Sequence, residues 1–403
     1  MKKKICLVTP GHIASNPRIV KEADALYQDG YDVTVIYTET THEIKKLDNE
    51  ILKVSGWKYE KVILGNKIIR GSRKLLNKLS KTITEHYIPN LTYAALSQNP
   101  YYFILNSTVI KNKADLYIGH NLPALPVVYN AAKTNSAIFG FDAEDFHSGE
   151  EIEGKELLLR KFLESKLLCK AEYLTCSSPN ISDLYNKEYN VFMETLLNVF
   201  PLNYAQNLDN QKKYSNSIYW FSQTIGPGRG LEEILKIISL TKTKPSLFLR
   251  GSTKVDEEFI RNLRELSVEY GLKHKLHFLE TSSPDSMVSC AAQYDMGISS
   301  ELNQPLNRSA CLTNKIFTYL LAGIPVILSK THAQHQIYSK IKDAALMIDL
   351  ENESQSAEII DEILGNKDKL NLMKTAAAEL AKNKYNWNIE KEKFLKIIEN
   401  TLR

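Results

Sequence analysis

The 403-residue sequence is poor in cysteine, and its five cysteines are not spaced for chemistry. Cys6, Cys169, Cys176, Cys290 and Cys311 form no C-x-x-C pair, so neither a zinc site nor the disulfide framework of a small secreted protein is indicated. Scattered cysteines of this kind are typical of a protein from a reducing cytosol. We therefore expect a cytoplasmic protein without a metal.

Long apolar runs are also missing. The stretch Ile5–Thr9, which follows three lysines, is too short for the apolar core of a signal peptide. No run approaches the ~18–20 apolar residues that span a bilayer. Contact with a membrane is therefore expected only at its surface, on the inner face.

Strong net charge is absent as well, since the whole chain carries a formal charge of +4. The basic excess lies in residues 51–90, which hold nine Lys or Arg and two Glu, so no general binding of nucleic acid is expected. Between Lys67 and Ile83, apolar residues recur at helical spacing with Lys and Arg between them. Two interpretations remain open: peripheral contact with an anionic membrane through residues 67–83, or an ordinary surface helix packed on its domain.

The chain is too long for one hydrophobic core, because cores stop growing near ~250–300 residues. Its pattern alternates short apolar strands with amphipathic helices, beginning with a strand at Lys4–Thr9, a helix at Pro17–Asp29 and a strand at Asp32–Tyr37. The alternation stops over residues 203–216, a polar stretch that we interpret as a linker, and resumes at Ile218. The predicted class is α/β, with two Rossmann-like domains.

The loop after the first strand contains Gly11 and His12. Gly11 has no Cβ, so the backbone there can approach a ligand closely. The single glycine does not make a dinucleotide-binding fingerprint. A plain strand-to-helix turn is the alternative.

A second glycine-rich loop, Gly226–Gly230, leads into a helix near Leu231–Leu240 and carries Arg229. A helix N-terminus has about +0.5 charge and free N–H groups, and Arg229 could add a bidentate contact to a diphosphate. The loop lacks the G-K-[ST] ending of a Walker A motif. Taken alone it is also compatible with a simple turn.

A third motif is Asn314-Lys315, at the start of a helix predicted over Thr313–Ala322. A cation in the first turn of a helix opposes the helix dipole, so Lys315 is a candidate for holding an anionic ligand. The alternative is a solvated surface lysine.

The fourth motif places Asp142, Glu144 and Asp145 at the end of a strand, the edge where such sheets bind ligands. Glu144 or Asp145 could act as general base on an acceptor hydroxyl. Carboxylates so close together could also bind Mg²⁺, although no second set of ligands is evident. Helix capping and solvated charges are the simpler alternative.

Three segments together resemble a known family. They are Thr9–Arg18, Phe221–Gly230 and Asn314–Ile327, and the last is similar to the block N-K-x-x-E-Y-x-x-A-G-x-P-V. The chain thereby resembles the retaining glycosyltransferases of the GT-B fold, the "group 1" or family-four glycosyltransferases. A terminal helix that contains Trp387 also fits this resemblance.

The resemblance implies two Rossmann-like domains that face each other across a cleft. Residues 1–200 would bind the acceptor, residues 201–385 the nucleotide sugar, and a helix at 386–403 would cross back to the first domain. Transfer would occur with retention and without a metal or cofactor, with a nucleotide-diphosphate sugar as donor substrate. Arg229 and Lys315 would stabilise the leaving diphosphate. Glu144, the candidate general base from the strand end, completes the predicted catalytic set.

The implied binding residues fall into two groups. The donor would be bound by Gly11, Gln223, Gly226, Arg229, Arg250, Gly251, Glu301, Asn314, Lys315 and Thr318, and the acceptor by His12, His120, Asp142 and Asp145.

The sequence departs from the family pattern at several of these positions. Thr318 and Ala310 stand where the family has two glutamates, and Glu301 is the nearest upstream carboxylate. Gln223 stands in place of a phosphate-binding arginine, and Glu144 where many members have histidine.

Three functions are therefore compatible with the sequence. The first is a glycosyltransferase that builds a cell-envelope polysaccharide or glycolipid from a nucleotide sugar and a glycan or lipid-linked acceptor. The second is a nucleotide-sugar epimerase of the GT-B type. The third is a non-catalytic partner subunit that has kept the fold.

Overall fold

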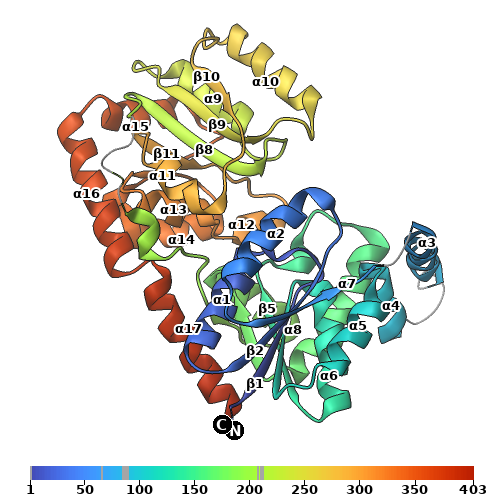
Figure 1. Cartoon of the computed structure of the whole chain (residues 1–403). Coiled ribbons are helices and arrows are strands. Elements are labelled where there is room, and N and C mark those ends of the chain that lie inside the picture. The colour runs from blue at the N-terminus through green and yellow to red at the C-terminus, as the bar shows by residue number, and fades with distance from the viewer. Residues whose placement is uncertain (1, 65–66, 84–89, 207, 209–212) are drawn as a thin grey trace. The chain divides into compact units, whose positions relative to one another are not determined.

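The computed structural model describes residues 2–64, 67–83, 90–206, 208 and 213–403 (Figure 1). Residues 207 and 209–212, part of the expected linker, lie outside the described residues. The chain divides into two compact units, one formed by Met1–Leu196 with Lys391–Arg403 and the other by Leu197–Glu390.

Unit 1 is built on a parallel seven-stranded sheet with the order β3-β2-β1-β4-β5-β6-β7. The central strand β1 pairs with both β2 and β4, so the strand order reverses beside it and creates the switch point where such sheets bind ligands. The strands are β1 (Lys4–Val8), β2 (Asp32–Thr38), β3 (Lys58–Val62), β4 (Leu116–His120), β5 (Ile138–Ala143), β6 (Tyr173–Cys176) and β7 (Glu194–Thr195).

Helices cover this sheet, and the first follows the capping rules predicted from the sequence. The Asn16 side chain accepts a hydrogen bond from the Ile19 amide at 3.2 Å, and Pro17 occupies the first helical position. The helices are α1 (Pro17–Gln28), α2 (His42–Val54), α3 (Lys67–Ile83), α4 (Leu91–Gln98), α5 (Tyr102–Lys111), α6 (Leu125–Asn135), α7 (Gly154–Leu167) and α8 (Pro179–Tyr189).

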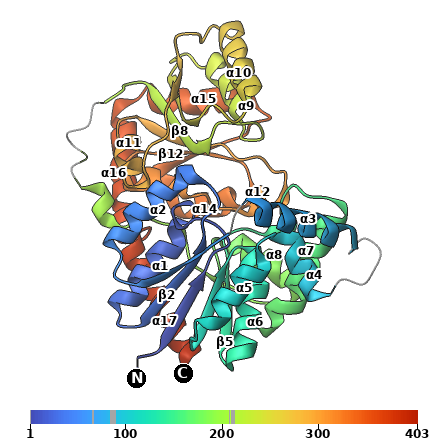
Figure 2. The ribbon, with the colours of Figure 1, turned by 45° about the vertical axis from the view of Figure 1, so that its right-hand side comes forward.

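The basic segment forms helix α3, as its apolar spacing predicted, and lies beside α4 (Figure 2). Asn77 links α3 to α4, because its side-chain amide donates hydrogen bonds to the carbonyl oxygens of Leu96 and Ser97 at 2.6 and 2.9 Å. Three leucines remain exposed to solvent, at 59% for Leu75, 46% for Leu76 and 48% for Leu79. Within the described part of the chain, no helix is long and apolar enough to cross a bilayer.

Unit 2 has a parallel six-stranded sheet with the order β10-β9-β8-β11-β12-β13. The strands are β8 (Ser217–Thr224), β9 (Ser246–Ser252), β10 (Leu276–Leu279), β11 (Met296–Ser299), β12 (Val326–Ser329) and β13 (Ala345–Ile348). The helices are α9 (Leu231–Leu240), α10 (Glu257–Glu269), α11 (Met287–Ala291), α12 (Leu306–Ala310), α13 (Asn314–Leu321), α14 (His332–Ile341), α15 (Glu353–Leu364) and α16 (Lys367–Asn383). The last helix, α17 (Trp387–Leu402), begins in unit 2 and continues in unit 1.

The core of unit 2 is closely packed against its sheet. Trp220 on β8 is fully buried, and the rings of Tyr219 and Tyr294 stack with centroids 4.5 Å apart. A Cβ at Gly297 on β11 would lie 2.2 Å from the ring of Tyr319, so only glycine fits at this crossing of strand and helix α13. This packing fixes helix α13 against strand β11.

Candidate functional site

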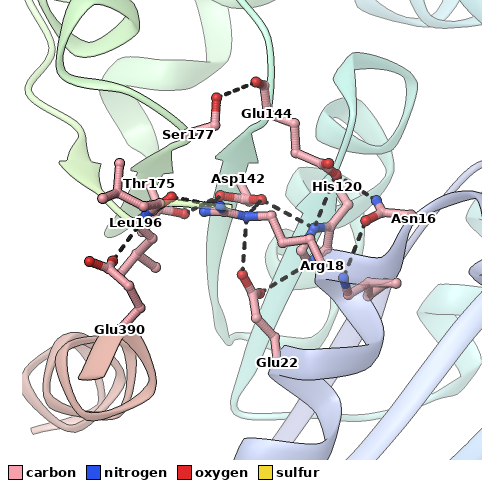
Figure 3. A network of polar contacts seen from close by, with 12 residues as sticks. Asn16, Arg18, Glu22, His120, Asp142, Glu144, Thr175, Ser177, Leu196 and Glu390 are labelled. Carbon is pink, nitrogen blue, oxygen red and sulfur yellow. Dashed lines mark hydrogen bonds and ion pairs between the residues drawn. The ribbon is translucent and has the colours of Figure 1, made fainter. Parts of the chain in front are cut away.

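A network of buried charges lies at the carboxyl end of the sheet in unit 1 (Figure 3). Arg18, on α1, donates to both carboxylate oxygens of Asp142, from Nε at 2.6 Å and from Nη2 at 2.7 Å. Its third nitrogen, Nη1, donates to the carbonyl oxygen of Leu196 at 2.7 Å. Arg18 also lies 3.4 Å from Glu22, one turn along the same helix. A buried charge is stable only with partners of this kind.

His120, the last residue of β4, lies between two carboxylates. Its Nε2 is 3.3 Å from Glu22 and its Nδ1 is 3.3 Å from Asp142. Burial disfavours the charged imidazolium, but the two carboxylates outweigh it and raise the pKa of His120 to about 10. Burial likewise opposes ionisation of Asp142, yet Arg18 and His120 hold the pKa of its carboxyl well below the usual range. The charges of Arg18 and His120 therefore balance those of Glu22 and Asp142.

Glu144 lies next to this balanced set, and it is the member that reaches solvent, with 19% of its side chain exposed. Asn16 donates a hydrogen bond to its carboxylate at 2.6 Å, and the Ser177 hydroxyl donates to its carbonyl oxygen at 2.6 Å. Burial and the nearby charge of Asp142 raise the pKa of Glu144 to about 7. A carboxyl group with this pKa can accept or release a proton near neutral pH.

The other residues proposed for unit 1 have different surroundings. The Nε2 of His12 accepts hydrogen bonds from the backbone amides of Thr40 and Thr41, both at 3.0 Å, so Nδ1 carries the proton and donates to Asp48 at 2.5 Å. Both ring nitrogens of His12 are thus engaged within the protein. A Cβ at Gly11 would have no heavy atom within 4 Å, so the loop beside it is open to an approaching ligand.

Asp145 is half-buried, and the hydroxyl of Tyr185 donates to its carbonyl oxygen at 3.2 Å. It follows Glu144 directly at the end of β5.

One group in the described part of the chain has the spacing of metal ligands, with the ligand atoms of Glu22, His120 and Asp142 within 4.8 Å of one another. Both oxygens of Asp142 already accept hydrogen bonds from Arg18, and the His120 imidazolium lies between the carboxylates. The cationic charge that a metal would bring is thus supplied by two side chains, so we assign this group to ion pairing.

The second cluster is in unit 2 and centres on Glu301, which follows β11 and is 2% exposed. Its carboxylate accepts a hydrogen bond from Lys315 Nζ at 2.6 Å and another from Arg308 Nη1 at 3.2 Å. Ser329 fixes the backbone of Glu301, since its hydroxyl accepts from the Glu301 amide at 2.8 Å and donates to the carbonyl at 2.6 Å. The carboxylate is therefore held in one place.

Arg229 adds a third cation to this cluster. Its carbonyl oxygen accepts a hydrogen bond from the Ser300 hydroxyl at 2.7 Å, which ties the loop before α9 to the end of β11. Burial and the charge of Arg308 lower the pKa of Arg229, and only Glu301 opposes this. Burial also opposes ionisation of Glu301, but Lys315, Arg229 and Arg308 lower its pKa. Three cations around one carboxylate leave an excess of positive charge near the start of α13.

Thr318 and Asn314 lie on α13 with Lys315. The Thr318 hydroxyl is buried and donates to the carbonyl oxygen of Asn314 at 2.9 Å, so it is bonded within its own helix. Asn314 is the first residue of α13 and is half-buried.

The remaining proposed donor residues lie at the ends of β8 and β9. Arg250 donates to the hydroxyl of Tyr219 at 2.8 Å and to the carbonyl oxygen of Glu280 at 2.7 Å. A Cβ at Gly251 would lie 2.9 Å from the carbonyl oxygen of Ser222, so the two strand ends approach closely there. Gln223 is exposed on β8, and a Cβ at Gly226 would have no heavy atom within 4 Å.

The structure thus brings Arg229, Glu301 and Lys315 together, and separately Asp142, Glu144 and His120. Sequence reasoning did not assign a role to Arg18 or Arg308, and it missed Glu22. The sequence contained a signal for the pairing of Arg18 with Glu22, because the two are four residues apart on one helix. They also adjoin the apolar face of that helix, where a buried charge needs a partner.

No protein-family model and no curated protein sequence matches the chain. Solved structures do match it over nearly its whole length. A glycosyltransferase from Rickettsia africae is 14% identical, with a TM-score of 0.71, over 100% of this chain and 99% of that chain. HepE of Anabaena, in complex with UDP, is 12% identical with a TM-score of 0.72, over 99% and 100% of the two chains. Sucrose-phosphate synthase from Thermosynechococcus elongatus is 12% identical with a TM-score of 0.73, over 99% of each.

Identities this low show the fold and nothing finer. The chain has the two-domain α/β fold of the GT-B glycosyltransferases, which confirms the predicted fold class and the predicted resemblance. The roles of individual residues stay predictions.

Proposed function

We propose that this chain is a glycosyltransferase that moves a sugar, with retention and without a metal, from a nucleotide-diphosphate donor to a polysaccharide or glycolipid acceptor. Its fold is shared with enzymes whose structures hold UDP or UDP-glucose. The donor would bind to unit 2 and the acceptor to unit 1.

The observation that carries this proposal is the cluster of Arg229, Arg308 and Lys315 around Glu301. Burial and the nearby charge of Arg308 lower the pKa of Arg229, so desolvation and repulsion between like charges both disfavour its charged form in this site. A diphosphate placed among them would relieve this repulsion and accept charge-assisted hydrogen bonds. A cluster with excess positive charge is therefore the arrangement expected of a diphosphate site.

The same cluster would assist bond breaking. As the acceptor oxygen bonds to the anomeric carbon, the bond from that carbon to the diphosphate breaks and the diphosphate leaves with the electron pair. Arg229 and Lys315 would stabilise the negative charge that develops on it. The proton of the acceptor hydroxyl would pass to Glu144, whose pKa of about 7 suits a base at neutral pH.

The acceptor side of the proposal includes helix α3. Leu75, Leu76 and Leu79 are exposed, and Lys74 and Lys78 on the same helix are exposed as well. Leucines beside lysines suit the surface of an anionic membrane, where a lipid-linked acceptor would be presented. We therefore place the protein at the inner face of the membrane as a peripheral protein.

Thermal shift against UDP, GDP, ADP, CMP and their common sugar conjugates tests the donor class. A ligand at 100 times its Kd adds about 2.7 kcal/mol of stability, which is readily seen. Stabilisation by one nucleotide family, followed by transfer of labelled sugar to a glycan or lipid extract, supports the proposal. Free nucleotide and altered free sugar without any acceptor would point instead to an epimerase, and no shift with any nucleotide to a non-catalytic subunit.

Sedimentation with vesicles tests the membrane contact. Vesicles with anionic lipid should bind the protein and neutral phosphatidylcholine vesicles should not. Replacing Lys74 and Lys78 by Glu should weaken binding by about tenfold or more, since each basic residue near the surface contributes about 1 kcal/mol. Equal binding of both vesicle types would exclude the electrostatic contact.

A further inference from the structure

Unit 1 contains a cavity that the proposed chemistry does not use. It has a volume of about 260 Å³ and is lined by the end of α4, the turn after β4, the turn around His147 and the first half of α7. The turns after β4 and β5 are at the carboxyl edge of the sheet, where α/β sheets bind ligands. The volume lies just below the ~300–1,000 Å³ of common small-molecule sites, so it suits a ligand of about one sugar ring.

Two buried nitrogen atoms on side chains that line this cavity have no partner. Among the described residues, His147 Nε2 and Arg160 Nε make no hydrogen bond. His147 is 5% exposed, and its other nitrogen, Nδ1, lies 3.0 Å from Glu150. Buried nitrogens of this kind nearly always have a partner, so the two positions call for a ligand atom or water.

The protonation of His147 makes its free nitrogen a donor. Burial disfavours the charged ring, but the hydrogen bond and charge of Glu150 outweigh it and raise the pKa of His147 above the ordinary value. The raised pKa favours the form of His147 that carries a proton on Nε2 as well as on Nδ1. Arg160 is held in place because it donates to the carbonyl oxygen of His147 and to the carboxylates of Glu150 and Glu156.

The charges in the cavity select the kind of ligand. Two donors, His147 and Arg160, are matched by two carboxylates, Glu150 and Glu156. The two carboxylates would repel a phosphate, and Arg160 would repel a cation. A neutral hydroxyl suits the site, because each hydroxyl both donates and accepts.

The lining of the cavity also includes two apolar residues. Leu122 and Pro123 line it beside the amide side chain of Asn121. A lining that combines polar and apolar residues suits a pyranose, which has both an apolar C–H face and a rim of hydroxyl groups.

We propose that this cavity binds a neutral pyranose unit of the acceptor, with His147 and Arg160 donating to its hydroxyls and Glu150 and Glu156 accepting from them. The assignment of this sugar to the acceptor rests on the proposed transferase function. The binding of the sugar itself does not.

Saturation-transfer NMR and calorimetry on the full chain test the binding. The probes are methyl glucopyranoside, methyl galactopyranoside and methyl N-acetylglucosaminide, with inorganic phosphate as the competing anion. We expect at least one glycoside to bind at millimolar concentration and phosphate not to displace it. Binding of phosphate in place of every glycoside, or no binding of any glycoside, would overturn the proposal.

Variants place the bound sugar. His147→Phe keeps the ring that packs near Phe141 and removes the free nitrogen, so the Kd should rise about tenfold. Gln98→Trp fills the cavity from α4 and serves if His147→Phe does not fold. Lys166→Ala, on an exposed part of the same helix as Arg160, is the control and should leave binding unchanged. Unchanged Kd in both cavity variants would show that the sugar binds elsewhere.

The two proposals fail separately. If nucleotide sugars bind and are hydrolysed but no glycoside binds, the cavity proposal is wrong and the transferase proposal stands. If a glycoside binds and His147→Phe weakens it but no nucleotide binds, the cavity proposal stands and the transferase proposal is wrong. If both hold, His147→Phe should raise the KM for the acceptor and leave hydrolysis of the donor unchanged.

Discussion

Replacing Arg229 by Met should weaken donor binding strongly and leave the protein as stable as before. The Arg229 side chain is partly buried, and burial and the charge of Arg308 lower its pKa, so the unliganded fold gains little from its charge. Methionine keeps the apolar stem. We therefore expect the free energy of unfolding to change by less than about 0.5 kcal/mol or to rise.

The effect on the liganded protein should be large. A hydrogen bond to a charged group contributes about 1.5–3 kcal/mol, so its loss should raise the Kd for a nucleoside diphosphate roughly 10–100-fold. At a concentration 100 times the wild-type Kd, ligand stabilisation should fall from about 2.7 kcal/mol to between about 1.4 and 0.4 kcal/mol. With about 2–4 °C per kcal/mol for a domain of this size, the wild-type shift is roughly 5–11 °C and that of the variant about half of it or less.

Calorimetry and thermal shift on Arg229→Met measure both quantities. Arg261→Met on α10 is the control, because that side chain is 67% exposed and lies outside the cluster. An unliganded Tm several degrees lower would mean that Arg229 is a structural anchor. An unchanged ligand shift would mean that the diphosphate does not bind at the cluster.

Three further predictions concern unit 1 and the packing of unit 2. Glu144 has a pKa of about 7 in the fold against an ordinary value of 4.5, so stability that is present below about pH 4.5 should be lost as the pH rises through 7. As the pH rises from about 5 to about 8, the free energy of unfolding of Glu144→Gln, measured in urea, should therefore increase by up to about 3 kcal/mol relative to the wild type. The same substitution should lower the rate of sugar transfer about 10²–10⁴-fold. If the stability of the two proteins changed with pH in parallel, the raised pKa would be refuted. Arg18→Met leaves buried carboxylates without their cation and should lower the free energy of unfolding by about 3–5 kcal/mol. Arg18→Lys should have an intermediate effect. An unchanged urea midpoint would show that the network is not needed for stability. Gly297→Ala forces a Cβ into an aromatic ring and should lower the free energy of unfolding by about 1–3 kcal/mol or more. Gly11→Ala is the control and should not lower the Tm, because there is open space for its Cβ. Equal effects of the two substitutions would contradict the packing described for Gly297.

The alternation of strands and helices could be predicted where one face of an element is apolar. Helix α3 was predicted over the range Lys67–Ile83 that it occupies, because its apolar residues repeat at helical spacing. Strand β3 was not predicted, since Lys58–Val62 is exposed at all but one residue and has no apolar alternation. It is a strand because it pairs with β2 at the edge of the sheet, and this pairing cannot be predicted from the residues of β3 alone.

The candidate site was predictable in part for a similar reason. Glycines and cations before a helix pointed to Arg229 and Lys315 from local pattern alone. The partner of Lys315 did not follow, because Glu301 is 14 residues away and only the packing of β11 against α13 brings the two side chains within 2.6 Å. Likewise Asp142 was named as a site residue, while its pairing with Arg18, 124 positions away, depends on the position of α1 beside the sheet.

The course of the chain between the units has a consequence for how the polypeptide can be divided. Unit 2 is one continuous segment, Leu197–Glu390, placed between the two parts of unit 1. Its first and last residues meet, since the Leu197 amide donates to the Glu390 carboxylate at 3.0 Å. On the other side of the junction, Lys393 donates to the carbonyl oxygen of Thr195. Unit 2 thus has the topology of an inserted domain with adjoining ends, the kind that can be excised at the gene level or circularly permuted. A short peptide that joins residue 196 to residue 391 would close unit 1 in the same way.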